Sequence, residues 1–436
     1  MNKKNLPKLL VITVNAWSDQ NSTGNTISNH FGNWDPTKLS NIYLRDEEID
    51  NDCCTTYFKI CEKDIVNSFF SKKGMGSEIN YLKQNKTNSN PKILKASKIK
   101  SFLIRIRPTI ILLLREVFWK IGFRSKTNLN NFLKKNVPEI IHMHCPNLIY
   151  GHRMLYYCHK QTKAKVVLFF GDEIYTYKNF WPLSVIYQSI LRYWIRKNIK
   201  ISEINYAATP ELSSYYSQLF GKEFKVLYKG AIILPPSPKL HSKPIKIVYA
   251  GNLLYDRWRA LSLISKAIEK VSTSQTEFQL SIYTGTALSN EMNISLNTKY
   301  SSIIGAVPFS EIKKIIESAD IVLHVESFKK KYVNIIKYSF STKIVDCIQS
   351  GSCVMGFGPI ELASINFLKQ SKAAIVVNTY DDIYTRLQEI IQDNNIIDDY
   401  STKMYNFSKN TFNLDIIRKN IYEDILELVS LNEQNK

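Results

Sequence analysis

Short apolar runs alternate with amphipathic segments along most of the 436-residue chain. Runs at 9–14, 165–170 and 278–283 have the length of buried strands. Segments such as 182–199 and 260–271 carry apolar residues at helical spacing. Because strands and helices alternate, the pattern predicts α/β domains built on parallel sheets.

A proline-rich polar stretch, ILPPSPKLHSKP, interrupts this alternation near the middle of the chain. Such a composition is typical of a linker. We therefore expect two Rossmann-like domains, residues 1–228 and residues 245–436, joined by a linker at 229–244. The first domain carries a basic insertion at 92–135, and the second ends in a helical tail.

The clearest α/β unit is the stretch 339–359, which reads as loop, helix and strand after a preceding strand. Ser341 and Thr342 are typical helix N-cap residues, Lys343 follows them, and Asp346 lies about one turn further on nearly the same face. Free N–H groups and a lysine suit a diphosphate, and a carboxylate suits sugar hydroxyls. The stretch therefore indicates a nucleotide-diphosphate site. A surface helix with a solvated lysine fits the same residues equally well.

Polar residues also follow strands of the first domain, where α/β proteins gather their binding groups. Gly24 and Asn25 follow the first strand, without the GxGxxG or Walker pattern of classical nucleotide sites. Asp172 follows the strand at 165–170; a helix N-cap is its alternative role. His144 ends another strand and shares a face with His142, but no second ligand group has metal-site spacing. We therefore expect no metal.

The charge balance is 58 − 38 = +20, which indicates an anionic partner: nucleic acid, an anionic membrane or a phosphorylated substrate. Seven cysteines, without a CxxC pair, favour a reducing cytosol over a disulfide framework. The apolar run at the N-terminus is short and lacks a cleavage site, so it reads better as a strand than as a signal peptide. No apolar run has the length of a membrane span.

The segment 92–135 contains twelve Lys and Arg residues against a single acid, Glu116. Apolar residues between 102 and 121 recur at helical spacing, with Pro108 as a break. A basic amphipathic segment with aromatic residues is typical of a membrane interface. We expect residues 92–124 to contact an anionic membrane surface; the alternative is a core helix pair with a solvated basic face.

Five stretches of the chain carry a resemblance to a known family: VNAWSDQNSTGNTISNHF at 14–31, VVLFFGDEIYTY at 166–177, YAGNLLYDRW at 249–258, GAVPFSEIKKIIESADIVLHVESF at 305–328 and STKIVDCIQSGSCVMGFGP at 341–359. Taken in this order, they resemble the GT-B glycosyltransferases, in particular retaining family 4 members of bacterial capsule and O-antigen polysaccharide synthesis. The resemblance implies two Rossmann-like domains facing a central cleft. It also implies glycosyl transfer without a metal or other cofactor.

The resemblance also implies roles for individual residues. Asp346 corresponds to the second acid of the family's E-x7-E motif, which binds the donor ribose. The first acid falls near Tyr338, a departure for which Glu326 would compensate. Arg257 falls on a phosphate-binding lysine of the family, and Asn252 replaces its companion arginine. The loop around Val307 corresponds to the site of the nucleotide base. The expected donor-binding residues are Gly24, Asn25, Gly251, Asn252, Arg257, Val307, Ser341, Thr342, Lys343 and Asp346.

We interpret the chain as an enzyme that moves a sugar from a nucleotide-sugar donor to a lipid-linked or surface-polysaccharide acceptor, with retention of configuration. Asp172 and Glu326 are the predicted catalytic residues, and His144 the predicted acceptor-binding residue. The expected location is the cytoplasmic face of the plasma membrane. One alternative is a catalytically silent relative that serves as an assembly partner, as Asn252 and Tyr338 suggest. The other is a basic nucleic-acid-binding protein, although no recognised nucleic-acid module is present.

Overall fold

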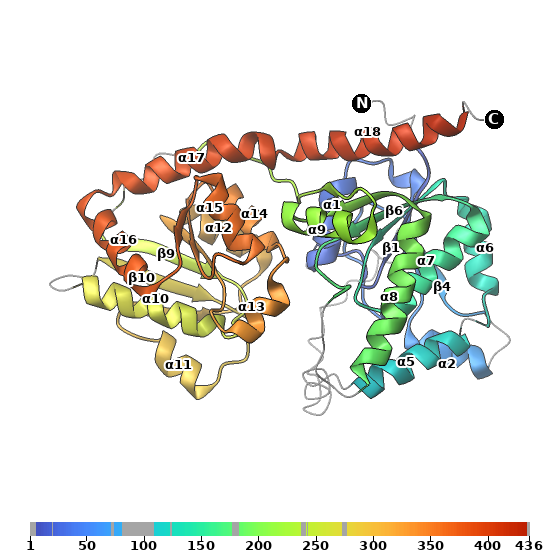
Figure 1. The fold of residues 1–436 in the computed structure, drawn as a ribbon, viewed down its shortest axis with the longest axis horizontal. Helices are drawn as coiled ribbons and strands as arrows, with labels where there is room; N and C mark the ends of the chain where they lie inside the picture. The colour runs from blue at the N-terminus through green and yellow to red at the C-terminus, as the bar shows by residue number, and fades with distance from the viewer. Residues whose placement is uncertain are drawn as a thin grey trace. The chain divides into compact units, whose positions relative to one another are not determined.

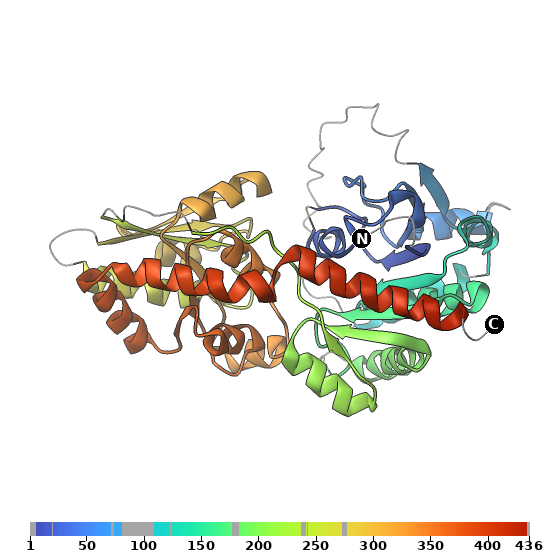
Figure 2. The same ribbon diagram turned by 90° about the horizontal axis from the view of Figure 1, so that it is seen from above.

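The computed structural model describes residues 6–19, 21–70, 74–80, 109–122, 124–176, 183–236, 241, 243–272 and 277–433. The chain divides into two compact units, each built on one sheet (Figure 1). Unit 1 comprises Met1–Leu227 with Arg418–Lys436, and unit 2 comprises Tyr228–Ile417. Helices lie on both faces of each sheet (Figure 2), so strands in the middle of the sheets are covered on two sides.

The sheet of unit 1 has the first strand of the chain near its centre. Its spatial order is β4 (Ser77–Asn80), β3 (Thr56–Lys59), β2 (Leu39–Tyr43), β1 (Leu9–Thr13), β5 (Ile140–His144), β6 (Lys165–Phe170), β7 (Ser202–Ala207) and β8 (Lys225–Val226). Neighbouring strands pair in parallel, except that β3 and β4 are antiparallel. All five residues of β1 are buried, which explains its uninterrupted apolar run.

The helices of unit 1 connect these strands and cover the sheet. They are α1 (Ser22–Phe31), the 3₁₀ helix η2 (Pro36–Lys38), α2 (Glu62–Phe70), α5 (Thr109–Gly122), α6 (Thr127–Asn136), α7 (Ile149–Thr162), α8 (Ser184–Ile201) and α9 (Pro210–Phe220). Residues 92–108 of the predicted basic segment lie outside the described residues. The part of that segment that is described forms α5 and most of α6.

The last helix, α18 (Leu414–Glu433), returns to unit 1 from Arg418 onward. Arg418 Nε donates to the carbonyl of Asn29 at 2.7 Å, and the ring of Tyr422 packs edge-on against Trp34. The sequence predicted that this helix is a tail of the second domain. From Arg418 onward the helix belongs to unit 1 instead, because its apolar side, including Ile421, is buried there.

The sheet of unit 2 is entirely parallel. Its spatial order is β11 (Ser301–Gly305), β10 (Phe278–Tyr283), β9 (Ile245–Ala250), β12 (Ile321–Val325), β13 (Cys353–Phe357) and β14 (Ile375–Val377). The helices are α10 (Arg257–Val271), α11 (Asn290–Leu296), α12 (Phe309–Ser318), α13 (Lys330–Ile336), α14 (Thr342–Gln349), α15 (Ala363–Ser371), α16 (Tyr380–Gln392) and α17 (Asn395–Thr411). The strand order reverses between β9 and β12, which makes that position the topological switch point.

Unit 2 begins at Tyr228, the last residue of the predicted first domain, and includes the start of the predicted linker. Tyr228 packs its ring against Phe340, Phe367 and Phe412, and Ala231, within that linker, forms a bridge with Asn413. The α/β class with two parallel-sheet domains is confirmed.

Candidate functional site

Two charged side chains meet at the carboxyl ends of β9 and β12, at the switch point of unit 2. Arg257 opens α10 after the loop that follows β9, and Glu326 comes directly after β12. Arg257 Nε donates to Glu326 Oε2 at 2.9 Å, and Nη2 donates to Oε1 at 3.0 Å. Arg257 Nη1 also donates to Asn252 Oδ1 at 2.7 Å. This forked pair fixes the guanidinium plane. Ligands of open α/β sheets bind at such switch points.

Lys343 adds a second cation to the same cluster. It lies in the first turn of α14, and a Cβ at Gly251 would collide with its Nζ, so the glycine makes room for the ammonium group. Burial, and then the charge of Arg257, lower the pKa of Lys343 to about 8. Arg257 is paired with the buried carboxylate of Glu326, and Lys343 lies close enough for the charge of this carboxylate to raise its pKa against the larger effect of burial. With two cations near this carboxylate, the cluster retains positive charge.

The N-terminus of α14 is oriented to add to this positive potential. Ser341 is its N-cap residue, but its side chain makes no capping hydrogen bond to the helix. Thr342 and Lys343 are the first two helical residues, so their N–H groups belong to the positive end of the helix dipole. Ser341, Thr342 and Lys343 thus occupy the helix start that the sequence predicts.

Two further titratable residues, Glu326 and His324, lie beside the cations of the cluster. Burial raises the pKa of Glu326, and the charge of Arg257 opposes this shift. His324 lies two residues earlier on β12, on the same face of the strand, with its Nε2 3.6 Å from Glu326 Oε1. Burial, and then the charges of Arg257 and Lys343, lower its pKa to about 3, so the ring is neutral. His324 is absent from the residues that the sequence predicted, although its spacing from Glu326 indicates a shared face.

Tyr249, which lies on β9, also belongs to the cluster. It is buried, and its hydroxyl donates to the carbonyl of Asn252 at 2.7 Å, which holds the loop that positions Arg257. Asn252 therefore supports the arginine with both its side chain and its backbone. Asn252, which stands where the resemblance predicts an arginine, therefore has a structural role in this chain.

Asp346 is paired with a lysine that sequence analysis did not single out. Lys229 Nζ donates to Asp346 Oδ1 at 2.9 Å, although the two residues are 117 positions apart. The side chain of Lys229 is 11% exposed and that of Asp346 28% exposed. The ribose-binding role of Asp346 stays a prediction. Val307, the expected base-site residue, follows β11 at the same edge of the sheet.

In unit 1 the predicted residues lie at the carboxyl edge of the sheet. Gly24 is in the first turn of α1, where a Cβ would collide with the backbone of Ser18, so close backbone approach requires glycine. The N–H of Asn25 donates to the carbonyl of Asn21 at 3.0 Å. Both contacts are local, and the donor-binding role of Gly24 and Asn25 stays a prediction.

His144 and Asp172 end up near one another because β5 and β6 are neighbours. A Cβ at Gly171 would lie 2.9 Å from His144 Nε2, and the exposed Asp172 follows that glycine. Burial lowers the pKa of His144 to about 4, so its ring is neutral. The N-cap of α8 is Leu183 rather than Asp172. Within the described ranges, no three His, Cys, Asp or Glu residues are grouped for a metal ion.

No family model and no curated protein matches the sequence. Solved structures do match over almost the whole chain. HepE from Anabaena in complex with UDP is 10% identical, with coverage of 96% of this chain and 99% of that chain and a TM-score of 0.63. Sucrose-phosphate synthase from Thermosynechococcus elongatus is 9% identical, with coverage of 97% and 100% and a TM-score of 0.63. Trehalose 6-phosphate synthase from Burkholderia multivorans is 10% identical, with coverage of 99% and 98% and a TM-score of 0.61. At such identities the similarity establishes the fold, which is that of the GT-B glycosyltransferases.

Proposed function

We propose that the chain is a glycosyltransferase that binds a nucleotide-diphosphate sugar at the switch point of unit 2. The cluster of Arg257, Lys343 and Glu326 is the observation that carries this proposal. It holds Arg257, paired with Glu326, and Lys343 beside the start of α14. A diphosphate supplies the missing negative charge and accepts hydrogen bonds from the helix N-terminus. The UDP complex of HepE, which shares the fold, supports this assignment.

The charges of the cluster also suit the chemistry of transfer. When the bond between the sugar and the diphosphate breaks, negative charge develops on the leaving nucleoside diphosphate. Arg257, Lys343 and the N–H groups of α14 would stabilise that charge where it forms. Because Glu326 is already paired with Arg257, its geometry favours a positioning role over the catalytic role that the sequence predicts. Asp172 remains the proposed base and His144 the proposed acceptor-binding residue.

Replacement of Lys343 tests the donor site. Isothermal titration of UDP into Lys343→Ala should give about 10- to 100-fold weaker binding than wild type, because a charge-assisted contact to phosphate is lost. Lys266→Ala removes an exposed lysine of the same unit and should bind like wild type. Unchanged UDP affinity in a folded Lys343→Ala protein would exclude the phosphate role.

Sugar release separates an active enzyme from a silent relative. Both should bind nucleoside diphosphates, but only the enzyme should release sugar from a nucleotide-sugar donor, by transfer or by slow hydrolysis. If a panel of nucleotide sugars is bound and none is cleaved in the presence of membrane extracts, the silent alternative replaces the enzyme.

We further propose a lipid-linked or surface-polysaccharide acceptor, retention of configuration, and peripheral attachment to the cytoplasmic face of the plasma membrane. Support for the attachment comes from α5, which exposes Ile110, Leu114, Val117 and Ile121 along one side, with exposed fractions from 38% to 63%. These residues belong to the apolar stripe that sequence analysis assigned to a membrane interface. None of the described helices has the length and apolarity that crossing a bilayer requires.

The other side of α5 packs inside unit 1. Trp119 stacks on Tyr150 with ring centroids 4.2 Å apart, and Arg115 donates to Glu62 at 2.8 Å and to the Tyr150 hydroxyl at 2.7 Å. The indole and this guanidinium therefore anchor the helix to the fold. They leave the opposite stripe for contact with lipid.

A further inference from the structure

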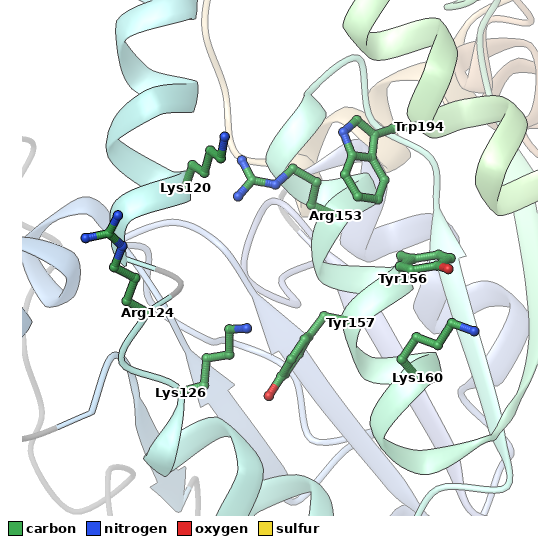
Figure 3. A pocket seen from close by; sticks show the side chains of 8 residues that line it. All are labelled: Lys120, Arg124, Lys126, Arg153, Tyr156, Tyr157, Lys160 and Trp194. Atoms are coloured by element: carbon green, nitrogen blue, oxygen red, sulfur yellow. The ribbon is translucent and has the colours of Figure 1, made fainter.

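Unit 1 contains a second cationic site, on the outer surfaces of its helices. A pocket of about 420 Å³ opens where the end of α5 and the start of α6 meet α7 and α8 (Figure 3). Five cations and three aromatic rings line it: Lys120, Arg124, Lys126, Arg153, Lys160, Tyr156, Tyr157 and Trp194. Among the residues that the structure describes, no carboxylate lines this pocket.

The cations of the pocket are packed against rings and against one another. Lys126 Nζ lies 4.3 Å from the centre of the Tyr157 ring, and the side chains of Lys120 and Arg153 extend toward each other in Figure 3. Burial, and then the charge of Arg153, lower the pKa of Lys126. A bound anion would relieve this repulsion and recover the charge that desolvation disfavours.

The carboxyl group of Glu116 compensates only part of the positive charge of Arg153. Glu116 Oε2 lies 3.9 Å from Arg153 Nη1, at the outer limit of an ion pair. Burial raises the pKa of Glu116 to about 7, so this carboxyl is partly protonated at neutral pH. The pocket therefore keeps an excess of positive charge.

Exposed apolar side chains flank the pocket on the two helices that frame it. On α5 the stripe Ile110, Leu114, Val117 and Ile121 runs beside Lys120. On α8, Ile186, Ile190 and Tyr193 are 40% to 57% exposed and precede Trp194. The helices α5 and α8 contact each other, so these two sets of exposed apolar residues lie on neighbouring helices of unit 1. A binding site for a water-soluble anion would not need such surroundings.

We propose that this pocket binds the phosphate headgroup of an anionic membrane lipid, while the exposed apolar residues of α5 and α8 enter the headgroup boundary of the bilayer. Lys and Arg side chains meet lipid phosphates, Tyr and Trp rings suit the polar–apolar boundary, and aliphatic side chains gain by leaving water. The inference rests on the membrane attachment proposed above and gives it a headgroup site, and it needs neither a nucleotide nor catalysis.

Single-stranded nucleic acid is the competing occupant, because cations and rings also bind phosphates and bases. The exposed aliphatic residues distinguish the two. Nucleic acid offers them no apolar phase, whereas a bilayer does. The surroundings of the pocket therefore favour lipid.

Flotation of the full chain with vesicles tests the proposal. Wild type should float with phosphatidylcholine vesicles that contain phosphatidic acid and should stay behind with phosphatidylcholine alone. The triple replacement Lys120→Ser, Lys126→Ser and Lys160→Ser should weaken binding about 100-fold, because each cation near the surface contributes about 1 kcal/mol. Leu114→Ser with Val117→Ser should weaken binding at least about tenfold through lost apolar burial.

A control triple, Lys266→Ser, Lys314→Ser and Lys369→Ser, changes the net charge equally at exposed positions of unit 2 and should float like wild type. Thermal unfolding confirms that each variant is folded, and UDP affinity should be unchanged in all of them, whether or not the donor proposal holds. Equal loss in the pocket and control triples would overturn the proposal. So would tight binding of glycerol 3-phosphate together with flotation that ignores Leu114 and Val117. Loss of single-stranded DNA binding without loss of flotation would assign the pocket to nucleic acid.

Discussion

In unit 2, Arg257 pairs with a buried carboxylate beside Lys343, whereas in unit 1 five cations gather around three aromatic rings and, in the part of the chain that the structure describes, no carboxylate lines the pocket they form. Both regions attract anions, but they hold their charges differently. The forked contact to Glu326 orients one guanidinium in one plane. The lysines of the pocket lie on long side chains at helix surfaces. The first arrangement suits one diphosphate in one pose, and the second suits phosphates that arrive in many positions.

The difference has a physical cause in burial. Burying a cation without a partner costs several kcal/mol of folding free energy. Arg257 can therefore stay largely buried and charged in the folded protein only because Glu326 lies beside it. In the pocket of unit 1, Lys120, Arg124 and Lys160 are exposed and stay hydrated, and Lys126 and Arg153 are only half-buried, so the fold depends less on a carboxylate there. We therefore expect changes in the first region to alter stability and nucleotide affinity, and changes in the second to alter only association with surfaces.

The largest effect is expected for Glu326→Gln. The substitution keeps the shape of the side chain but removes the charge that pairs with Arg257 and lies near Lys343, so the free energy of unfolding should fall by about 3–5 kcal/mol. Urea denaturation measures the change. Glu291→Gln is the matched control, because it breaks an exposed pair with Arg259 and should cost at most about 1 kcal/mol. Equal stability of the two variants would show that the buried pair does not support the fold.

An intermediate effect is expected from pH. Burial lowers the pKa of Lys343 to about 8, whereas an unfolded lysine titrates at about 10.4. Above pH 8 the ammonium group loses its proton, so UDP affinity should fall by up to about tenfold per pH unit. The unfolded chain binds more protons between these two values, so this group makes stability rise with pH there. Lys343→Arg keeps its charge and should flatten the affinity profile measured by titration calorimetry. A wild-type profile as flat as that of the arginine variant would contradict the shift.

The smallest effect is expected for Asp346→Asn. If Asp346 accepts from the donor ribose, UDP should bind about fivefold more weakly, the size of one net hydrogen bond. Inorganic pyrophosphate has no ribose, so its affinity should be unchanged in the same variant. If both ligands weaken equally, the carboxylate acts through its pair with Lys229 instead.

The local pattern of the chain predicted much of what forms each region. The apolar run of β1, the helix start at Ser341 to Lys343, and the stripe from Ile110 to Ile121 are all present. These features depend on periods of two and 3.6 residues and on helix capping, which neighbouring residues determine. The two-domain α/β class follows from the same alternation.

Only the tertiary structure decided which side chains meet. Glu326 pairs with Arg257 across 69 positions because β9 and β12 are neighbours at the switch point, and Asp346 pairs with Lys229 across 117 positions. Lys126, Arg153 and Trp194 line one pocket because α6 and α8 both pack against α7. A period along the chain reports which face of an element is buried, but not which element covers it. Strand order and helix packing determine which element covers that face, and both depend on contacts between residues that are distant in the sequence.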